Sequence, residues 1–175
     1  PRAVSQEIQE NIAYQQSNFK KQGAVIGLSG GVDSSLVTVL YAKALGRENI
    51  KVLLLPDSES NRTHFCDALN FAKKLEINWE VIDITPLLRD LKIRKIGFLS
   101  SIPLLNKFKS FLYQKTHCYY QKITGETPFA SQLKGLGEKP YHNYIQKRQA
   151  ILNGKHRLRM VLLYYYAEQE NRMVV

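Results

Sequence analysis

Apolar and polar positions change pattern several times along the first half of the chain. Residues 24–28 and 50–55 are near-continuous apolar runs of strand length, typical of parallel strands buried on both faces. Residues 34–45 and 63–75 instead repeat apolar side chains at helical spacing. With a third strand predicted at residues 79–82, this order predicts an α/β fold on a parallel sheet with right-handed crossovers.

Two further helices are predicted beside this unit. In residues 4–21 the apolar side chains at roughly helical spacing are Val4, Ile8, Ile12 and Phe19. The helix predicted at residues 34–45 is expected to end at Gly46. Asp83 is expected to cap a short helix at residues 87–91, with Pro86 in its first turn.

The end of the chain predicts one more helix and a strand. Asn153 and Gly154 indicate a turn or cap, and residues 155–170 after them are apolar on nearly all sides. This composition predicts a deeply buried helix, with the tyrosines at 164–166 in the core rather than stacked on a base. Residues 173–175 resemble the beginning of a fourth strand.

Residues 92–150 break the pattern and carry most of the charge. They hold eleven lysines and arginines against two acidic residues, in a chain whose net charge is +10. We expect helical turns near residues 104–120 and a loop at 124–141. Such a segment suggests an anionic partner, although solubility alone would explain it. We interpret it as a basic insertion or lid within one domain.

Length and composition narrow the class of protein. A chain of 175 residues fits a single domain with a real core. Its cysteines, Cys66 and Cys118, form neither a metal-ligand spacing nor a disulfide framework, which favours a reducing cytoplasm. The sequence shows no signal peptide and no apolar run near the ~20 residues of a membrane span.

The turn between the strand at 24–28 and the helix at 34–45 carries the clearest chemistry. Its two glycines allow a sharp turn with bare N–H groups near an anion, its serines add donors, and a helix N-terminus follows. Its carboxylate would repel a triphosphate unless a cation lay between them, which points to Mg²⁺. A plain turn with Asp33 as N-cap is the alternative. The candidate ATP-binding residues are Ser29, Gly30, Gly31, Val32, Asp33, Ser34 and Ser35.

This turn lacks the Gly-Lys-Ser/Thr ending of a Walker A loop. It resembles the Ser-Gly-Gly-x-Asp-Ser loop of the ATP pyrophosphatases, the PP-loop superfamily, at five positions in order. That resemblance implies a three-layer, doubly wound parallel sheet of the adenine nucleotide alpha-hydrolase-like (Rossmann-like) kind. Members of the superfamily cleave ATP between the α- and β-phosphates and adenylate an acceptor oxygen.

Three further stretches resemble one branch of that superfamily, the NAD synthetases. They are residues 45–49 running into 53–56, residues 68–75 followed by 81–86, and an Asn-x-Lys-x-Arg-x-Arg-Met pattern at residues 153–160 followed by 163–167. The family adenylates the nicotinate carboxylate of deamido-NAD, releases pyrophosphate, and lets ammonia displace AMP to give NAD. The resemblance implies Mg²⁺ on Asp33 and deamido-NAD on Arg157, with Asn153 beside it. No general base is assigned, because positioning and charge neutralisation would carry the catalysis.

Charge gives a second argument for the arginine pattern. Lys155, Arg157 and Arg159 crowd the predicted first turns of a helix, where each cation opposes the macrodipole by ~0.3–1 kcal/mol. A bound anion would remove that cost, and a solvated basic face is the alternative. Because residues 157 and 159 point to different sides, we expect one to bind substrate while the other packs or pairs.

Other candidates are weaker. The resemblance implies that the loop after the second strand lies where the family holds the adenosine. Ser60 or Asn61 of this loop would equally well cap the next helix instead of binding a ligand. His64 is expected at the surface, Cys66 in the core and Asp83 as a cap rather than a ligand. The remaining polar residues of that loop are Asp57, Ser58 and Arg62.

Two departures from the family stand out. The family continues into a Gly-Thr-x-x-x-x-Glu segment whose Glu is a second Mg²⁺ ligand, so we expect a chain that is incomplete at its C-terminus. Residues 92–150 are also longer and more basic than usual. ATP, deamido-NAD and ammonia are the implied partners, with a homodimer expected and a glutaminase domain or subunit left open as the nitrogen source.

Two other functions compete with this one. A PP-loop tRNA-modifying enzyme, of the lysidine or thiouridine synthetase type, would use residues 92–150 to contact RNA. A non-catalytic nucleotide-binding module is the second. Residues 55–56 and 153–160 favour the NAD synthetases, so neither a nucleic acid nor a membrane partner is expected.

Overall fold

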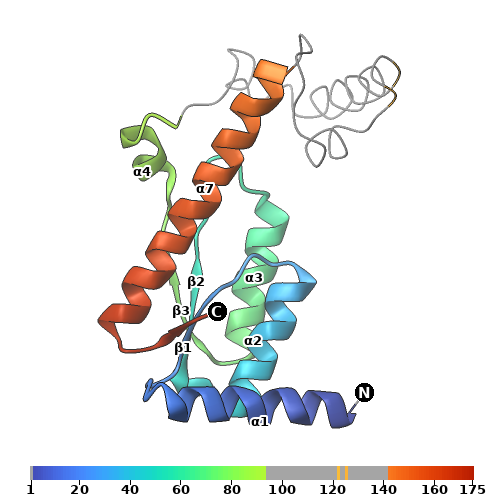
Figure 1. The fold of residues 1–175 in the computed structure, drawn as a ribbon, viewed down its shortest axis with the longest axis vertical. Coiled ribbons are helices and arrows are strands. Elements are labelled where there is room, and N and C mark those ends of the chain that lie inside the picture. Colours follow the sequence, from blue (N-terminus) through green and yellow to red (C-terminus); the bar gives the residue numbers. More distant parts are fainter. Residues whose placement is uncertain (1, 94–121, 123–124, 126–141) are drawn as a thin grey trace. The chain divides into compact units, whose positions relative to one another are not determined.

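The computed structural model describes residues 2–93, 122, 125 and 142–175. The chain divides into two compact units, residues 1–92 with 155–175, and residues 93–154. Its helices and strands, in chain order, are α1 (Arg2–Asn18), β1 (Ala24–Gly27), α2 (Val32–Leu45), the 3-10 turn η1 (Arg47–Asn49), β2 (Ile50–Leu54), α3 (Arg62–Lys74), β3 (Asn78–Val81), α4 (Thr85–Asp90), α7 (His142–Gln169) and β4 (Met173–Val174) (Figure 1).

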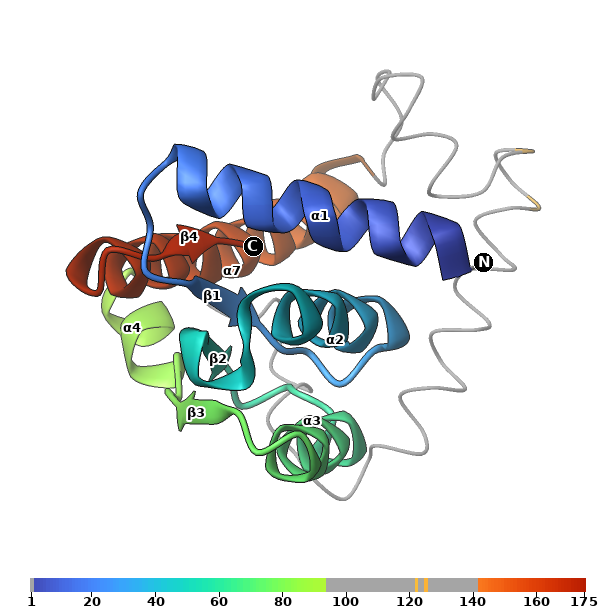
Figure 2. The ribbon, with the colours of Figure 1, turned by 90° about the horizontal axis from the view of Figure 1, so that it is seen from below.

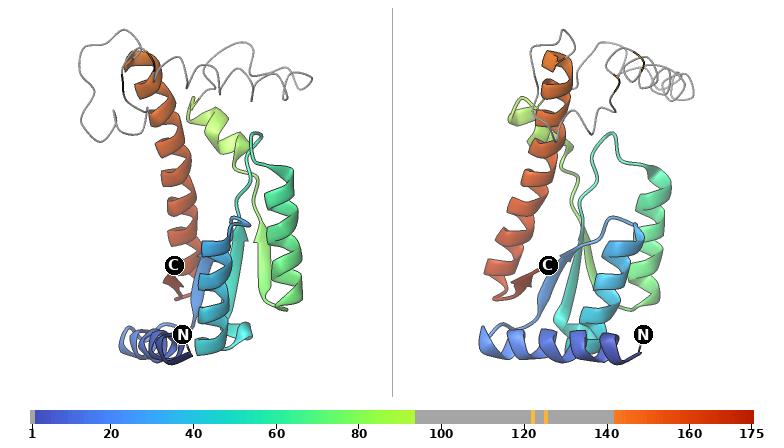
Figure 3. Two further views of the ribbon diagram at one scale, coloured as in Figure 1. Left: turned by 90° about the vertical axis from the view of Figure 1, so that its right-hand side faces the viewer. Right: turned by 45° about the vertical axis from the view of Figure 1, so that its right-hand side comes forward.

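The first unit is built on a four-stranded parallel sheet in the order β3-β2-β1-β4. Helices α2 and α3 cover one face, and the part of α7 from residue 155 onward covers the other (Figures 2 and 3). A Cβ added at Gly27 would lie 3.2 Å from a methyl group of Leu163, so helix and strand touch closely. The three-layer, doubly wound parallel sheet is therefore confirmed.

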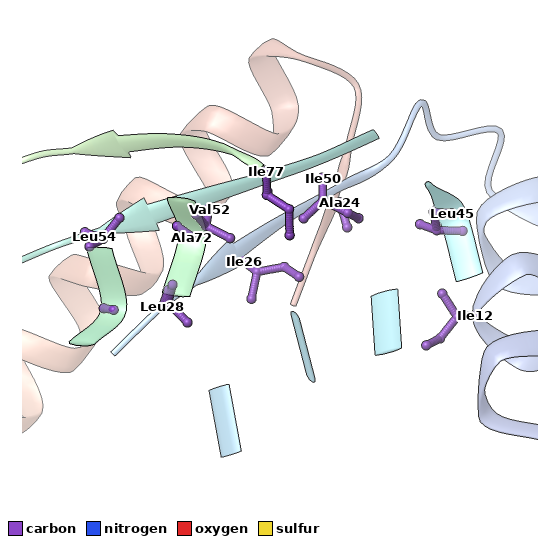
Figure 4. Packing of buried hydrophobic residues seen from close by; sticks show 11 residues of the cluster. Ile12, Ala24, Ile26, Leu28, Leu45, Ile50, Val52, Leu54, Ala72 and Ile77 are labelled. Atoms are coloured by element: carbon purple, nitrogen blue, oxygen red, sulfur yellow. The ribbon is translucent and has the colours of Figure 1, made fainter. Parts of the chain in front are cut away.

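The core lies between the sheet and the helices α2 and α3. Alternate residues of β1 and β2 point to this face and pack together (Figure 4). The intervening residues Val25 and Leu53 face the opposite layer and are also completely buried. Both central strands are thus covered on both faces, as their continuous apolar runs predict.

Most predicted helix boundaries are confirmed, but in two helices the buried residues differ from those that the apolar spacing indicates. Gly46 ends α2 in a left-handed conformation with φ +89°, as expected. Leu36, one of the apolar side chains at helical spacing in residues 34–45, is 57% exposed and so does not belong to the buried face of α2. In α1, Ile12 is buried but Val4 is exposed, and Phe19, which was predicted inside this helix, lies exposed just after its end. Because α1 lies across the end of α2, only a narrow stripe of it is covered (Figure 1).

Two predictions about α7 are wrong. The helix runs without a break through Asn153 and Gly154, since a glycine costs only about 1 kcal/mol inside a long helix. Residues 155–159 therefore lie mid-helix, and the macrodipole argument for their lysine and arginines fails. Deep burial is also wrong, because α7 covers the sheet with one face only. Its exposed apolar residues include Met160, Val161, Tyr164 and Tyr165.

The remaining elements agree with the sequence where the structure describes them. Asp83 accepts hydrogen bonds from Thr85, and β4 pairs with β1. The helical turns predicted at residues 104–120 lie outside the described residues, as does the loop at 124–141 except Gly125. No helix among the described residues has the length and apolar character needed to cross a bilayer.

Candidate functional site

The turn between β1 and α2 requires a glycine at residue 30. Gly30 has φ +83°, a conformation that side chains disfavour. A Cβ at this position would lie 2.1 Å from the carbonyl oxygen of His64, in the first turns of α3. The turn is therefore pressed directly against the beginning of the neighbouring helix.

Serine hydroxyls hold the turn together from inside. The hydroxyl oxygens of Ser29 and Ser34 lie 2.9 Å apart, and Ser29 Oγ accepts a bond from the Gly31 N–H. Both Ser34 and Ser35 donate their hydroxyls to the Gly31 carbonyl, at 3.1 and 2.9 Å. These internal hydrogen bonds preorganise the turn.

The amino end of α2 is open toward this turn. Gly31 is its N-cap residue and supplies no side-chain hydrogen bond, so the first-turn N–H groups keep their capacity for an anion. Asp33 lies exposed in the first turn and does not cap the helix. The alternative in which Asp33 is a plain N-cap is wrong.

A cavity of about 630 Å³ opens at the carboxyl ends of β1 and β2. The turn forms its floor through Ser29 and Gly31, and the loop after β2 forms one wall. The side of α7 supplies another wall. The residues of these two walls and of the beginning of α3 include Leu55, Pro56, Ser60, Asn61, His64, His156, Arg159, Met160 and Leu163.

The loop after β2 is held by Asp57. Its Oδ2 lies 3.1 Å from Lys155 Nζ and 3.2 Å from Arg159 Nη2, both on α7. Its Oδ1 accepts a 2.7 Å bond from the Glu59 N–H. Burial alone would raise the pKa of Asp57, but the Glu59 hydrogen bond and the two cations outweigh it and lower that pKa.

The predicted cap residues separate clearly. Asn61 caps α3 by accepting a 2.9 Å bond from the Thr63 N–H, which confirms one of the two expected caps. Ser60 instead bonds within its own loop, at 2.8 Å from the Asp57 N–H. At Asp83, the Thr85 hydroxyl and N–H both donate to the carboxylate and lower its pKa. The N-cap of α4 is nevertheless Ile84, so Asp83 supports the start of this helix from one residue before the cap, and the prediction that it is the cap is wrong.

The pairing half of the prediction about the two arginines of α7 is met by Arg159. Arg159 pairs with Asp57 and also donates from Nε to the Leu55 carbonyl at 3.0 Å. Arg157 is exposed, and the described residues provide it with no ion pair. Asn153 belongs to the second unit, where its side chain accepts a 3.0 Å bond from Gln149. The structure therefore does not show these two residues as one site.

The remaining candidates near the loop after β2 differ in whether they line the cavity. Ser58 and Arg62 are exposed on the loop and on the first residue of α3. His64 is exposed and lines the cavity, whereas Cys66 is exposed and not in the core, so that expectation is wrong. Residue 66 lies on a helix whose buried residues are its small alanines, which explains the error.

Sequence reasoning missed two cavity features. It did not assign Lys155 to the loop after β2, although its ammonium is buried there, and it did not place His156 in the cavity wall. The available signal was the spacing of Lys155 and Arg159, four residues apart on one helix face. Among the residues that the structure describes, no three His, Cys, Asp or Glu side chains gather into a metal-binding group.

The sheet and its flanking helices define a doubly wound α/β protein of the Rossmann-like class. Residues 4–97 match the family model for NAD synthase. An ammonia-dependent NAD⁺ synthetase of Coprothermobacter proteolyticus is 33% identical over 156 residues, covering 89% of this chain and 52% of that protein. The chain therefore belongs to the NAD synthase family.

Solved structures agree with this assignment. An ammonia-dependent NAD synthetase from Campylobacter jejuni superposes with a TM-score of 0.62 at 25% identity, over 99% of this chain and 54% of that one. An NMN synthetase from Francisella tularensis gives 0.65 at 25% identity, over 99% and 52%. The chain thus spans about half the length of the relatives that it matches.

Proposed function

We propose that this chain provides the ATP-binding part of an ammonia-dependent NAD synthetase. The observation that carries the proposal is the preorganised turn at residues 29–35, which stands at the amino end of α2 and opens into the 630 Å³ cavity. Family membership supports the reaction. The same membership counts against a tRNA-modifying enzyme and a non-catalytic module.

The proposed reaction has two steps. An oxygen of the nicotinate carboxylate of deamido-NAD attacks the α-phosphorus of ATP, and the bond to the β-phosphate oxygen breaks to release pyrophosphate. Ammonia then adds to the activated carbonyl carbon, loses a proton, and displaces AMP to give the amide of NAD. In both steps the protein's part is to bind and orient the phosphates and to neutralise charge.

The ATP-binding residues in this proposal are those of the turn, Ser29 to Ser35. Asp33 would hold Mg²⁺ together with phosphate oxygens, because Mg²⁺ is usually bound by one or two carboxylates plus substrate phosphates. Its exposed carboxylate, one residue into α2, fits that role. Bound Mg²⁺ would neutralise the charge of the triphosphate. Arg157 and Asn153 are proposed contacts for deamido-NAD.

One assay tests the proposal. The chain is mixed with Mg-ATP, deamido-NAD and ammonium, and AMP and NAD are followed together. Equal amounts of both products are expected, and Asp33→Asn should abolish them. Asp67→Asn, an equal charge change on the exposed surface of α3 outside the cavity lining, is the control. ATP binding without either product would contradict the catalytic part of the proposal.

The substrate that receives the ammonia needs a separate assay, because one similar structure is that of an NMN synthetase. Parallel assays would offer deamido-NAD or nicotinate mononucleotide with the same ATP and ammonium. We expect faster amidation of deamido-NAD. Faster amidation of the mononucleotide would move the proposal to the second substrate.

The remaining partner and location predictions stay predictions. A homodimer is supported by the apolar side chains that α7 leaves exposed, such as Val161, Tyr164 and Tyr165. Sedimentation equilibrium would measure it, and a monomer at all concentrations would contradict it. A cytoplasmic location, an interrupting basic segment at residues 92–150 and a glutaminase partner likewise remain untested proposals.

A further inference from the structure

Two cations of α7 meet one carboxylate of the loop after β2. Asp57 is 5% exposed in its side chain, and Lys155 is 11% exposed. Lys155 Nζ also lies 2.6 Å from Glu59 Oε2. Arg159 donates from Nε to the Leu55 carbonyl and from Nη2 to Asp57, so its fork spans the loop on both sides of Pro56.

The carboxylate of Asp57 has little capacity left for a ligand. Its Oδ2 receives Lys155 and Arg159, and its Oδ1 receives the Glu59 N–H at 2.7 Å and the Ser60 hydroxyl at 3.4 Å. An ionised carboxylate offers about four acceptor sites, and all four directions are used here. Asp57 therefore acts through the loop rather than by touching a bound molecule.

The joined elements are two walls of the same cavity. The loop contributes Leu55, Pro56 and Ser60 to the lining, and α7 contributes Arg159 itself and Leu163, one turn further along the same helix face. Because the ion cluster ties these walls together at the cavity's edge, it fixes how far apart they stand. Separating such a buried pair is costly, because it leaves an uncompensated charge away from water.

We propose that Asp57, Lys155 and Arg159 form a clamp that sets the width of the nucleotide cavity, with Asp57 and Lys155 as positioning residues. This inference rests on the proposed function, because it requires ATP in that cavity. Losing the clamp lets the wall formed by the loop move away from α7, so nucleotide affinity falls while the sheet and its core remain folded.

A second ion cluster in the same unit provides a matched control. Lys51 on β2 pairs with Glu170, just past the end of α7, and with Glu80 on β3 at 3.2 Å. Its side chain is 11% exposed, the same fraction as that of Lys155. None of these three residues lines the cavity. This cluster also joins α7 to the sheet, but at the amino end of the strands.

The test measures the affinity for Mg-ATP by titration calorimetry and the stability by urea unfolding. Both are measured for the wild-type chain and for Asp57→Asn, Lys155→Met and Lys51→Met. All titrations are made where each variant is folded. For Asp57→Asn and Lys155→Met we expect the Kd for ATP to rise roughly tenfold, as for a displaced binding wall. Lys51→Met should lose comparable stability with its ATP Kd unchanged.

A double variant makes the test stricter. If Asp57 and Lys155 act as one clamp, combining Asp57→Asn with Lys155→Met should raise the Kd hardly more than either change alone. An unchanged Kd in both single variants would overturn the clamp, as would an equal rise in Lys51→Met. A wild-type chain that does not bind ATP would instead overturn the proposed function, so the two failures are distinguishable.

Discussion

Gly30 lies so close to His64 that a Cβ on the glycine would stand 2.1 Å from the histidine's carbonyl oxygen. The turn that carries the proposed phosphate site is thereby fixed to the first turns of α3, the helix that also bounds the cavity. This contact involves backbone, so neither partner can yield by changing a side-chain rotamer.

Replacing Gly30 by alanine should therefore displace the turn. The added methyl meets a backbone oxygen, and a positive φ costs a non-glycine residue ~1–2 kcal/mol. We expect loss of measurable ATP binding in calorimetry and a lower urea midpoint. Gly31→Ala is the matched variant for stability, because its φ is −84° and a Cβ there meets Ser29 Oγ at an ordinary 3.4 Å. Equal destabilisation of both variants would argue against this account.

The packing of the core predicts that two aliphatic side chains contribute very differently to the free energy of unfolding. Ile26 on β1 is 2% exposed, and Ile26→Ala should cost about 2–5 kcal/mol in the free energy of unfolding. Leu36 on α2 is 57% exposed, and Leu36→Ala should change it by less than about 0.5 kcal/mol. Urea unfolding at neutral pH measures both, and similar losses would contradict the packing described above.

The lowered pKa of Asp57 predicts how stability depends on pH. The folded state holds this pKa below its usual value, near 3.9 in unfolded chains, so its ionisation adds stability above that value. This contribution is lost as the pH falls from about 4 through the lower, folded pKa. Wild-type chain should therefore lose its stability advantage over Asp57→Asn in acid. Urea midpoints at pH 7, 5, 4 and 3 measure this, and a constant difference would refute it.

Tyr166 and Tyr165 provide a neighbouring pair with opposite expectations. Tyr166 donates its hydroxyl to Glu80 at 2.7 Å, and this bond is the main reason that the pKa of Glu80 is lowered. Tyr166→Phe should cost about 0.5–1.5 kcal/mol and bring the pKa of Glu80 back toward its usual value. Tyr165 is 61% exposed, so Tyr165→Phe should change neither. Carboxyl titration by NMR, with urea unfolding, distinguishes them.

The order of strands and helices was predictable because each element has its own local pattern. Apolar runs such as residues 50–55 match a buried strand, and Gly46 marks a helix end through its conformational freedom alone. The turn at residues 29–35 was also found from sequence, since its glycines and serines are consecutive. Its hydroxyl contacts then follow from the conformation of a few residues.

Features that depend on distant residues could not be predicted in this way. The clamp joins Asp57 to Lys155 and Arg159, about a hundred residues later, and nothing local at either place specifies the other. The prediction of deep burial along α7 was wrong for a related reason. An apolar helix face shows that a side chain could be covered, but whether Tyr164 is covered depends on which layer lies beside it.

The pairing of β1 with β4 constrains how the molecule folds. Ala24 lies opposite Met173 in the parallel pair, so the central strand gains its second neighbour from a residue almost 150 positions later. Contacts of such long separation slow folding, because the intervening chain must be closed into a loop first. The closure penalty grows only logarithmically, by about 0.6 kcal/mol for each doubling of the loop. Evolution could therefore lengthen the segment between α4 and α7 considerably while this strand pair kept nearly the same thermodynamic stability.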